Sequence, residues 1–345
     1  MIIRDACNLC SNSSDNIAAR SFLLRQSDCP DHNWRNYLVH IGKPEITVDF
    51  MVCGSCGHIY QREILDDAEQ EVLRVKDLEQ VFAVNEYFSF RSTSRIINAK
   101  RFEGVIRFLI NNLINNLGNQ LSGFRVLDVG GREGGFGAPL INMGSDYTTI
   151  DVDDFGDDAI PGATFLRGNF DTYDFARPFD LITLNHVLEH VIDPPKTLAK
   201  CRELLNPGGF IFIDIPNLPI WPGTQHRSEF PISELLVETC RHVGFSLIDA
   251  ESILLGYGPS IIRAYRLLCQ KVERSTPPPS RNYRDYALNL LSDYHYDIVR
   301  SLTDDRKPFA IYGLNESSRQ LLQPVPLERS TFTCFVDDDP ALWGS

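Results

Sequence analysis

Short apolar runs alternate with helical patterns between about residues 124 and 270, and this alternation constrains the chain more than any other feature. Apolar runs of this length are typical of strands buried on both faces. Strands that alternate with helices form a parallel sheet covered by helices. We therefore expect an α/β fold here. Because the carboxyl ends of parallel strands meet at one edge of the sheet, residues just after each strand are the first candidates for a ligand site.

A glycine-rich turn follows the first predicted strand, over residues 124–129. Gly130 and Gly134 belong to this turn, and a helix is predicted to follow it as far as about Asn142. Glycine lets the backbone approach a ligand closely, and the helix N-terminus offers free N–H groups to an anion. Dinucleotide-binding folds share this arrangement, so the turn alone does not identify the ligand.

Polar side chains follow the next two predicted strands. The strand over 147–150 ends at Asp151, 23 residues after Asp128. A carboxylate at this place can accept both hydrogen bonds of a ribose diol, as it does in NAD-binding proteins. The third strand leads to Asn169 and Phe170, which could read the edge of an adenine and cover its face. Each polar residue is also an ordinary turn former, so each remains a hypothesis.

The fourth predicted strand begins a longer pattern, over residues 179–190. Asp193 is a typical helix N-cap and Pro194 a typical first helical residue, so we expect a helix from there to about Leu205. A Pro-Gly-Gly turn then leads to a fifth apolar strand, over 210–215, which ends in Pro-Asn.

The run VLEHV-x-DP, L-x-PGG and PN resembles class I S-adenosylmethionine-dependent methyltransferases, and it is similar to the subgroup that methylates small molecules. NAD-binding folds do not show it. The resemblance covers about residues 124–270. It implies a Rossmann-like sheet of seven strands, with the last two (about 245–250 and 260–270) as an antiparallel hairpin at the edge.

The glycine turn departs from the family's Asp-x-Gly-x-Gly-x-Gly loop. Asp128, Gly130 and Gly134 match it, but Arg132 stands where the middle glycine is expected. The resemblance implies S-adenosylmethionine as cofactor, with Asp151 on the ribose and Asn169 and Phe170 at the adenine. The other cofactor-binding residues that we predict lie beside the methionine part or close the pocket: Asp128, Gly130, Gly134, Asn185 and Tyr87.

Three residues are candidates for proton transfer. If the methyl acceptor is a carbon beside a keto group, a base must remove its proton, and histidine suits this task because its pKa lies near the working pH. His226 follows the fifth strand, in a Pro/Gly-rich loop, and His190 follows the fourth, with Glu189 behind both. The alternatives are that Glu189 and His190 only cap and pack a helix start, and that His226 is a solvated loop residue.

Two Cys-x-x-Cys pairs predict a metal site near the N-terminus. The chain has nine cysteines, and four of them form the pairs Cys7/Cys10 and Cys53/Cys56, with 42 residues between the pairs. Two such turns complete the tetrahedral four-thiolate shell of a structural zinc ion, which leaves no open position for catalysis. The alternatives are metal-free reduced thiols or a redox couple. Gly57 fits the left-handed position after the second pair. His58 is expected to be a neighbour of the site, with a substitute ligand as the alternative.

The segments on either side of residues 124–270 indicate a particular subgroup of methyltransferases. The cysteine pairs and an aromatic, Ser-rich segment at residues 86–94 resemble zinc-containing sugar C-methyltransferases. Residues 309–313 and 333–339 resemble the opening of a C-terminal Rossmann-like domain, although too little chain follows to complete one. The predicted division is a zinc-binding module (1–62), a helical linker or lid (63–118), the methyltransferase domain (119–272) and a short partial α/β segment (281–345).

Composition limits the partners. Lys and Arg total 33 against 46 Asp and Glu, a net charge of −13, so the chain lacks the basic surface of a nucleic-acid binder. No apolar run approaches the roughly 20 residues of a membrane-spanning helix. We expect a cytoplasmic enzyme with a small-molecule acceptor, for which a nucleotide-linked keto sugar is one candidate. O- or N-methylation of another metabolite, an NAD-dependent enzyme and a non-catalytic binding protein are the alternatives, and the sequence leaves the oligomeric state open.

Overall fold

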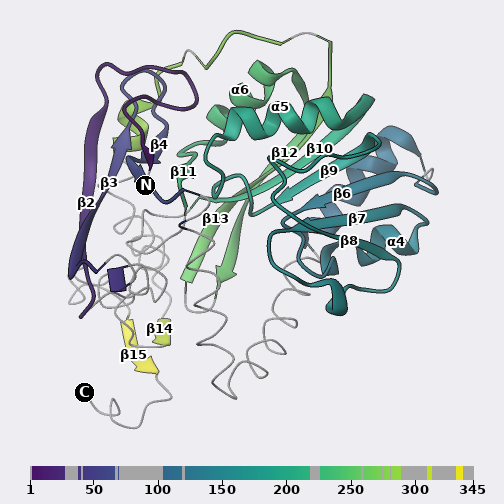
Figure 1. Cartoon of the computed structure of the whole chain (residues 1–345), viewed down its shortest axis with the longest axis horizontal. Helices are drawn as coiled ribbons and strands as arrows, with labels where there is room; N and C mark the ends of the chain where they lie inside the picture. The colour runs from purple at the N-terminus through teal and green to yellow at the C-terminus, as the bar shows by residue number, and fades with distance from the viewer. Residues whose placement is uncertain are drawn as a thin grey trace.

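Figure 1 shows a computed structural model of the chain. The structure describes residues 2–27, 38–39, 42–66, 69, 104–118, 121–217, 226–257, 260–273, 275–279, 281–288, 309–312 and 332–336. Within these ranges, no helix combines the length and the apolar character needed to cross a membrane.

A seven-stranded mixed sheet forms the centre of the molecule and confirms the expected α/β fold. Its strand order is β12-β13-β10-β9-β6-β7-β8. The five strands from β10 to β8 are parallel, and β13 runs antiparallel to both of its neighbours, as the expected edge hairpin requires. The strands are β6 (Arg125–Val129), β7 (Asp146–Asp151), β8 (Ala163–Arg167), β9 (Phe179–Asn185), β10 (Leu205–Asn217), β12 (Phe245–Tyr257) and β13 (Ser260–Lys271).

Helices cover both faces of this sheet, because successive residues of its central strands are apolar and point to opposite sides. Leu127 packs in one core with α5 (Pro194–Leu204) and α6 (Ser233–Val243), which lie side by side in Figure 1. Val126 packs in the opposite core with a helix over residues 104–117 and with α4 (Ala138–Asn142). The short 3-10 helices are η1 (Gly135–Gly137) and η2 (Gly156–Asp158).

The start of α5 follows from its sequence. The Asp193 side chain accepts a hydrogen bond from the Lys196 amide at 3.1 Å, and Pro194 is the first helical residue. This arrangement satisfies one of the N–H groups that every helix leaves free at its N-terminus. It also ends the segment that connects β9 to α5, which carries Glu189 and His190.

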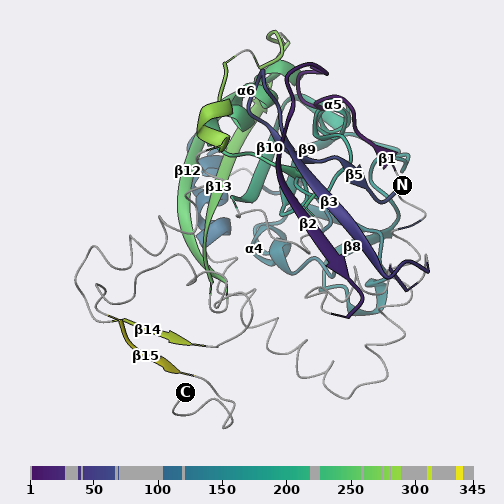
Figure 2. The same ribbon diagram turned by 90° about the vertical axis from the view of Figure 1, so that its left-hand side faces the viewer.

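The N-terminal region forms an antiparallel sheet that includes a strand from the methyltransferase-like region. Its order is β11-β4-β3-β2, and β2 and β3 form the long pair in Figure 2. The strands are β2 (Ile17–Arg25), β3 (Glu45–Val52), β4 (Ile59–Gln61) and β11 (Ser228–Glu229), with β1 (Ile2–Ile3) and β5 (Glu63–Ile64) paired beside them. The predicted units 1–62 and 119–272 therefore share one sheet.

The C-terminal segment carries a parallel strand pair, β14 (Phe309–Tyr312) and β15 (Phe332–Val336), as its sequence pattern indicated. Before it, a short helix over 284–288 reaches back to the N-terminal region, where Ala287 is buried beside Leu65. The predicted lid residue Tyr87 and most of the predicted linker 63–118 lie outside the described residues.

Candidate functional site

A cavity of about 610 Å³ opens at the carboxyl ends of the parallel strands. It lies where the strand order reverses around β6, the usual ligand position in an open α/β sheet. The cavity brings together five of the predicted site residues, from four different strand ends: Gly130, Asp151, Asn169, Phe170 and His190. Arg227 also lines it and was not predicted.

The glycine turn keeps a left-handed backbone at position 132 although arginine stands there. Gly130 (φ 65°) and Gly134 (φ 83°) adopt left-handed conformations, and so does Arg132 (φ 51°), which stands where the family has a glycine. The Arg132 amide donates to Asp151 Oδ2 at 3.1 Å, and its carbonyl accepts from the Thr149 hydroxyl at 3.3 Å. These bonds hold the backbone in a conformation that non-glycine residues rarely adopt. A Cβ on Gly130 would come within 2.8 Å of Val187, so this glycine is required by space as well.

Asp128 lies beneath the turn and does not line the cavity. Its side chain is 1% exposed and accepts hydrogen bonds from the Tyr147 and Thr183 hydroxyls, both at 2.6 Å. Burial raises the pKa of Asp128 to about 6, although the two hydroxyls favour its charged form. A Cβ on Gly131 would meet Asp128 Oδ2 at 2.2 Å. The buried carboxylate therefore supports the turn from below.

Asp151 ends β7 and presents its carboxylate at the cavity wall. Its Oδ1 accepts from the Asp153 amide at 3.0 Å, and its Oδ2 accepts from the Arg132 amide at 3.1 Å. Burial raises its pKa, and the two amide bonds work in the opposite direction. Each carboxylate oxygen can accept more than one hydrogen bond, so a fixed, partly used carboxylate remains able to accept from a diol.

Asn169 and Phe170 follow β8 at the opposite wall. Asn169 Oδ1 accepts from the Asp171 amide at 2.9 Å, the turn-forming role that the sequence left open. Phe170 packs on Phe175 at a ring-centroid distance of 5.9 Å while it lines the cavity. Asn185, at the tip of β9, lies opposite Asp214 of β10 and is not among the cavity-lining residues.

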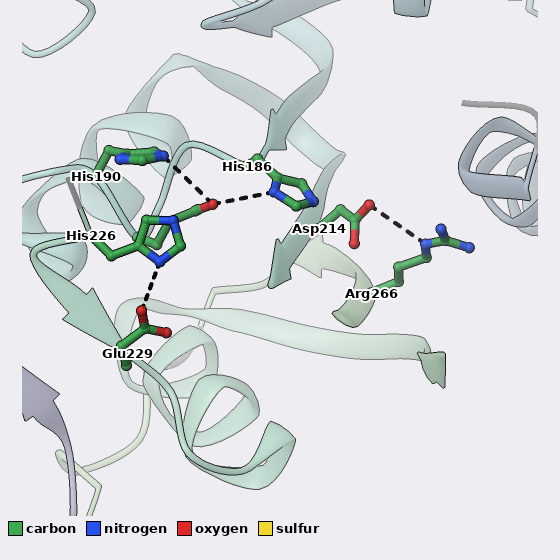
Figure 3. Close-up of polar contacts among 7 residues, drawn as sticks. His186, His190, Asp214, His226, Glu229 and Arg266 are labelled. Carbon is green, nitrogen blue, oxygen red and sulfur yellow. Dashed lines mark hydrogen bonds and ion pairs between the residues drawn. The ribbon is translucent and has the colours of Figure 1, made fainter. Parts of the chain in front are cut away.

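Figure 3 shows a cluster of histidines and carboxylates, and its member His190 lines the cavity. Glu189 is 1% exposed, and its Oε1 lies 3.5 Å from His186 Nδ1 and 3.8 Å from His190 Nε2. Burial raises the pKa of Glu189 to about 8, even though the His226 charge lowers it. The rings of His190 and His226 meet edge to face at 4.8 Å. The three predicted proton-transfer residues therefore lie together.

Glu229 is a member of this cluster that the sequence interpretation missed. His226 Nδ1 and Glu229 Oε1 are 2.7 Å apart, and both side chains are nearly buried. Burial lowers the pKa of His226, but the Glu229 and Glu189 carboxylates outweigh burial and raise it. A Glu three residues after a candidate base was the available signal. A carboxylate on Nδ1 leaves Nε2 as the ring atom that exchanges a proton.

His186, which directly follows Asn185 at the end of β9, stands out by its backbone. It is one of four non-glycine residues with positive φ among the described residues, at 55°.

Donor atoms of Glu189, His190 and His226 all lie within 4.8 Å of one another, a spacing that suits proton transfer and would also accommodate a cation.

The four predicted metal ligands form a second centre. One donor atom from each of Cys7, Cys10, Cys53 and Cys56 lies within 4.8 Å of all the others. The Cys7–Cys56 and Cys10–Cys53 sulfur distances are 3.7 and 3.5 Å. Tetrahedral zinc with bonds of about 2.3 Å needs sulfur atoms roughly 3.8 Å apart, so the cluster fits this ion.

The local backbone explains how the two cysteine turns form. Ser11 (φ 60°) and Gly57 (φ 78°) are both left-handed, at matching positions after each pair. The Ser11 amide donates to the Cys7 carbonyl at 2.8 Å, and the Gly57 amide donates to the Cys53 carbonyl at 2.9 Å. The left-handed turn expected at Gly57 is present, and Ser11 adopts it too.

The central region is similar to known methyltransferases. Residues 98–254 match the model of a methyltransferase domain family. The ubiquinone biosynthesis O-methyltransferase of Aromatoleum aromaticum is 29% identical over 166 residues, which cover 40% of this chain and 70% of that protein. The enzyme of the same name from Nitrosospira multiformis is 31% identical over 111 residues, and the match covers 28% of this chain and 45% of that protein. The chain therefore spans less than half of the latter relative.

Among solved structures, the chain is similar to the 1,6-didemethyltoxoflavin-N1-methyltransferase of Burkholderia thailandensis with bound 1,6-didemethyltoxoflavin and S-adenosylhomocysteine. The TM-score is 0.44 at 19% identity, and the match covers 63% of this chain and 96% of that one.

Proposed function

We propose that the whole protein transfers a methyl group from S-adenosylmethionine to a small molecule, because residues 98–254 match a methyltransferase domain family and the curated relatives of this region are methyltransferases. One observation carries the proposal: the cavity at the strand ends has the Asp151 carboxylate on one wall and the edge of a buried histidine–carboxylate cluster on another. A cofactor-holding group and a proton-transfer group therefore border the same space.

The cofactor would lie along the strand ends. Asp151 accepts hydrogen bonds from the ribose diol, and the backbone at Gly130 runs beside the methionine part. Asn169 and Phe170 hold the adenine. Asn185 and Tyr87 complete the pocket in this proposal, whereas Asp128 and Gly134 act through the shape of the turn. S-adenosylmethionine supplies the methyl group, and the protein's main task is to hold the acceptor about 3 Å from it, which can contribute ~7–11 kcal/mol.

For the acceptor, we propose carbon methylation of a keto sugar linked to a nucleotide. Such a carbon must lose a proton, and His226 has the features of a base for this step: it is nearly buried, and a carboxylate contacts its Nδ1 at 2.7 Å. His190 and Glu189 extend the path of the proton. Oxygen methylation is the second candidate, because the curated relatives named above are O-methyltransferases. A binding protein without turnover is the third.

We propose that Cys7, Cys10, Cys53 and Cys56 hold a structural zinc ion as four thiolates, which requires a reducing compartment such as the cytoplasm. Metal analysis of the purified protein should give about one equivalent. A zinc content near zero in folded protein would reject this part of the proposal.

Calorimetric titration tests the cofactor site. S-adenosylmethionine and S-adenosylhomocysteine should bind the wild-type protein, and Asp151→Ala should weaken binding by about tenfold or more, since a charged hydrogen-bond acceptor contributes ~1.5–3 kcal/mol. Asp154→Ala removes a carboxylate of the same loop that is 63% exposed and should bind normally. NAD is the competing ligand, and binding of NAD in place of both adenosyl compounds would overturn the assignment.

A turnover experiment tests the base. His226→Ala should keep its affinity for S-adenosylhomocysteine but lose methyl transfer, measured with nucleotide keto sugars and with catechols as candidate acceptors. Full activity of this variant would remove His226 from the mechanism.

A further inference from the structure

We propose that the four-thiolate module is a positioning device for the proton-transferring histidine, and that it acts through the short strand pair β4–β11. This inference rests on the proposed function, because it concerns the base of that reaction. The module itself contacts no reacting atom. Its role is to fix the backbone on which Glu229 and His226 stand.

The first observation is the pairing of these strands. β11 is only two residues long, and it pairs antiparallel with β4 in the register Ser228–Tyr60 and Glu229–Ile59. β4 begins three residues after Cys56, the last residue of the second cysteine turn. The residue that holds His226 is therefore a strand partner of the segment that leaves the thiolate cluster.

The second observation is that the N-terminal region also binds the backbone carbonyl of Arg227, the residue just before β11. The Arg227 carbonyl accepts from the Arg4 guanidinium at 2.9 Å and from the Gln61 amide at 3.2 Å. Arg4 is 8% exposed, lies three residues before Cys7, and also donates to the Ile192 carbonyl. One buried side chain thus joins the thiolate module to both loops that border the cavity, at Arg227 and Ile192.

The third observation concerns the packing between the two centres. His58 is fully buried, with Nδ1 3.7 Å from Cys7 Sγ, and its ring contacts Phe230 at a centroid distance of 5.5 Å. Phe230 directly follows Glu229. Three kinds of contact therefore connect the cysteine turns to residues 227–230: the β4–β11 pairing, the hydrogen bond from Arg4 and the ring contact of His58 with Phe230.

The methyltransferase core holds the same loop at its two ends. The Glu189 carbonyl accepts from the amides of Arg227 and Ser228, at 2.8 and 3.2 Å, and the Tyr265 hydroxyl donates to the Pro231 carbonyl at 3.2 Å. Among the described residues, the direct backbone partner of Glu229 is in β4. Loosening the module should therefore release Glu229 from His226 and leave the cofactor cavity largely formed.

The test uses the imidazole of His226 and does not require the acceptor. Arg4→Met removes the guanidinium that donates to the Arg227 and Ile192 carbonyls and keeps a side chain of similar length. The variant is studied as full-length, zinc-loaded protein bound to S-adenosylhomocysteine. Ring ¹⁵N spectra over a pH series report both the tautomer and the pKa. Groups facing His226 are Glu229, Glu189 and His190, and all three are retained in this variant.

We expect wild-type His226 to be protonated at Nδ1 when neutral and to titrate above the usual value near 6.5. In Arg4→Met, the pKa should fall by about one unit, a tenfold change in the protonated fraction at a given pH, and the Nε2-protonated tautomer should appear. Arg4→Lys keeps the positive charge but lacks the guanidinium with its two hydrogen bonds, so the pKa of His226 should fall by less than in Arg4→Met. Cys10→Ser, which loosens the module at its metal, should shift His226 in the same direction.

Arg62→Met is the matched control, because Arg62 belongs to the same module, is 44% exposed and pairs only loosely with Asp5, at 3.9 Å. It should leave the His226 titration unchanged. An Arg4→Met titration equal to that of the control, with S-adenosylhomocysteine still bound, overturns the inference. If Arg4→Met does not fold, Arg4→Lys and Cys10→Ser decide by the same criterion. Failure of wild-type protein to bind S-adenosylhomocysteine at all is the distinct result that rejects the proposed function.

Discussion

Single residues decide whether the glycine turn can form, and Gly131 is the most constrained of them. Its φ is not left-handed, so this angle by itself does not require glycine. A Cβ there would nevertheless meet Asp128 Oδ2 at 2.2 Å and Thr149 Oγ1 at 2.4 Å. Both atoms belong to residues that are buried within the sheet and cannot move away easily.

Gly131→Ala should therefore destabilise the protein by about 1–3 kcal/mol, the range for overpacking a well-packed site, and weaken S-adenosylhomocysteine binding with it. Gly135→Ala is the matched control, since the nearest atom to its Cβ, from the Glu133 side chain, is 3.9 Å away. Urea unfolding and calorimetry measure both effects. Equal stability and equal S-adenosylhomocysteine affinity of the two variants would show that the turn can move to accommodate a Cβ at position 131.

The buried carboxyl of Glu189 should make the stability of the fold depend on pH. Burial raises its pKa from 4.5 to about 8, in surroundings that include His186, His190, His226, Glu229 and Asp214. The folded state then holds a proton that the unfolded state releases, so the favourable contribution of this group is complete below about pH 4.5 and is lost as pH rises towards 8.

Glu189→Gln keeps the shape of the side chain and removes its titration. Between pH 5 and pH 8 the free energy of unfolding of the wild type should fall relative to this variant, by an amount on the order of 1 kcal/mol or more. Glu203→Gln, on the exposed side of α5, should track the wild type. Urea midpoints at the two pH values give the comparison, and parallel curves for Glu189→Gln and the wild type would contradict the raised pKa.

At the scale of elements, the start of α5 links stability to the cavity. Asp193 caps the helix through the Lys196 amide, and Thr197, one turn in, lines the cavity. Asp193→Ala should cost about 1 kcal/mol of stability, the usual value for a lost N-cap. Asp174→Ala, an exposed residue before β9, should cost much less. Thermal unfolding followed by circular dichroism distinguishes them.

The same element shows what local sequence can predict. The cap, the first proline and the strand on each side of α5 depend on residues close together in the chain, and they were expected from the pattern alone. β11 is different, because two residues carry no periodicity and its partner β4 lies about 170 positions earlier. The sheet shared by the two predicted units depends on this distant pairing, whereas Glu229 lies only three residues after His226.

The predicted cofactor-binding residues show the same limit of sequence-based prediction. Gly130, Asp151, Asn169 and Phe170 follow strands, so the rule that strand ends meet at one edge was enough to bring them together. Asp128 belongs to the same motif, yet it points into the sheet towards Tyr147 and Thr183. A motif gives the position of a residue in the chain, and the side of the strand on which it lies decides whether it can touch a ligand.

For the whole molecule, the shared sheet predicts how loss of metal should spread. Val48, Phe50 and Val52 of the N-terminal region lie in a small core that is separate from the two cores of the central sheet. The buried cysteines Cys7, Cys53 and Cys56 pack instead in the core that contains α5 and α6. The small core needs a further source of stability, which the proposed zinc ion would supply. Chelation of zinc should therefore unfold the N-terminal strands first and leave the seven-stranded sheet intact.

Hydrogen exchange followed by mass spectrometry provides the measurement. After chelation, amides of β2, β3 and β4 should exchange at least tenfold faster, and the amides of β11 should exchange faster with them although β11 is remote in sequence. The amides of β6, β7 and β9 should keep their protection, and S-adenosylhomocysteine should still bind. The untreated protein and zinc-restored protein are the controls. Exchange that rises in β2–β4 while β11 stays protected would show that the core alone holds the loop of His226, because a strand that depends on its partner cannot outlast it.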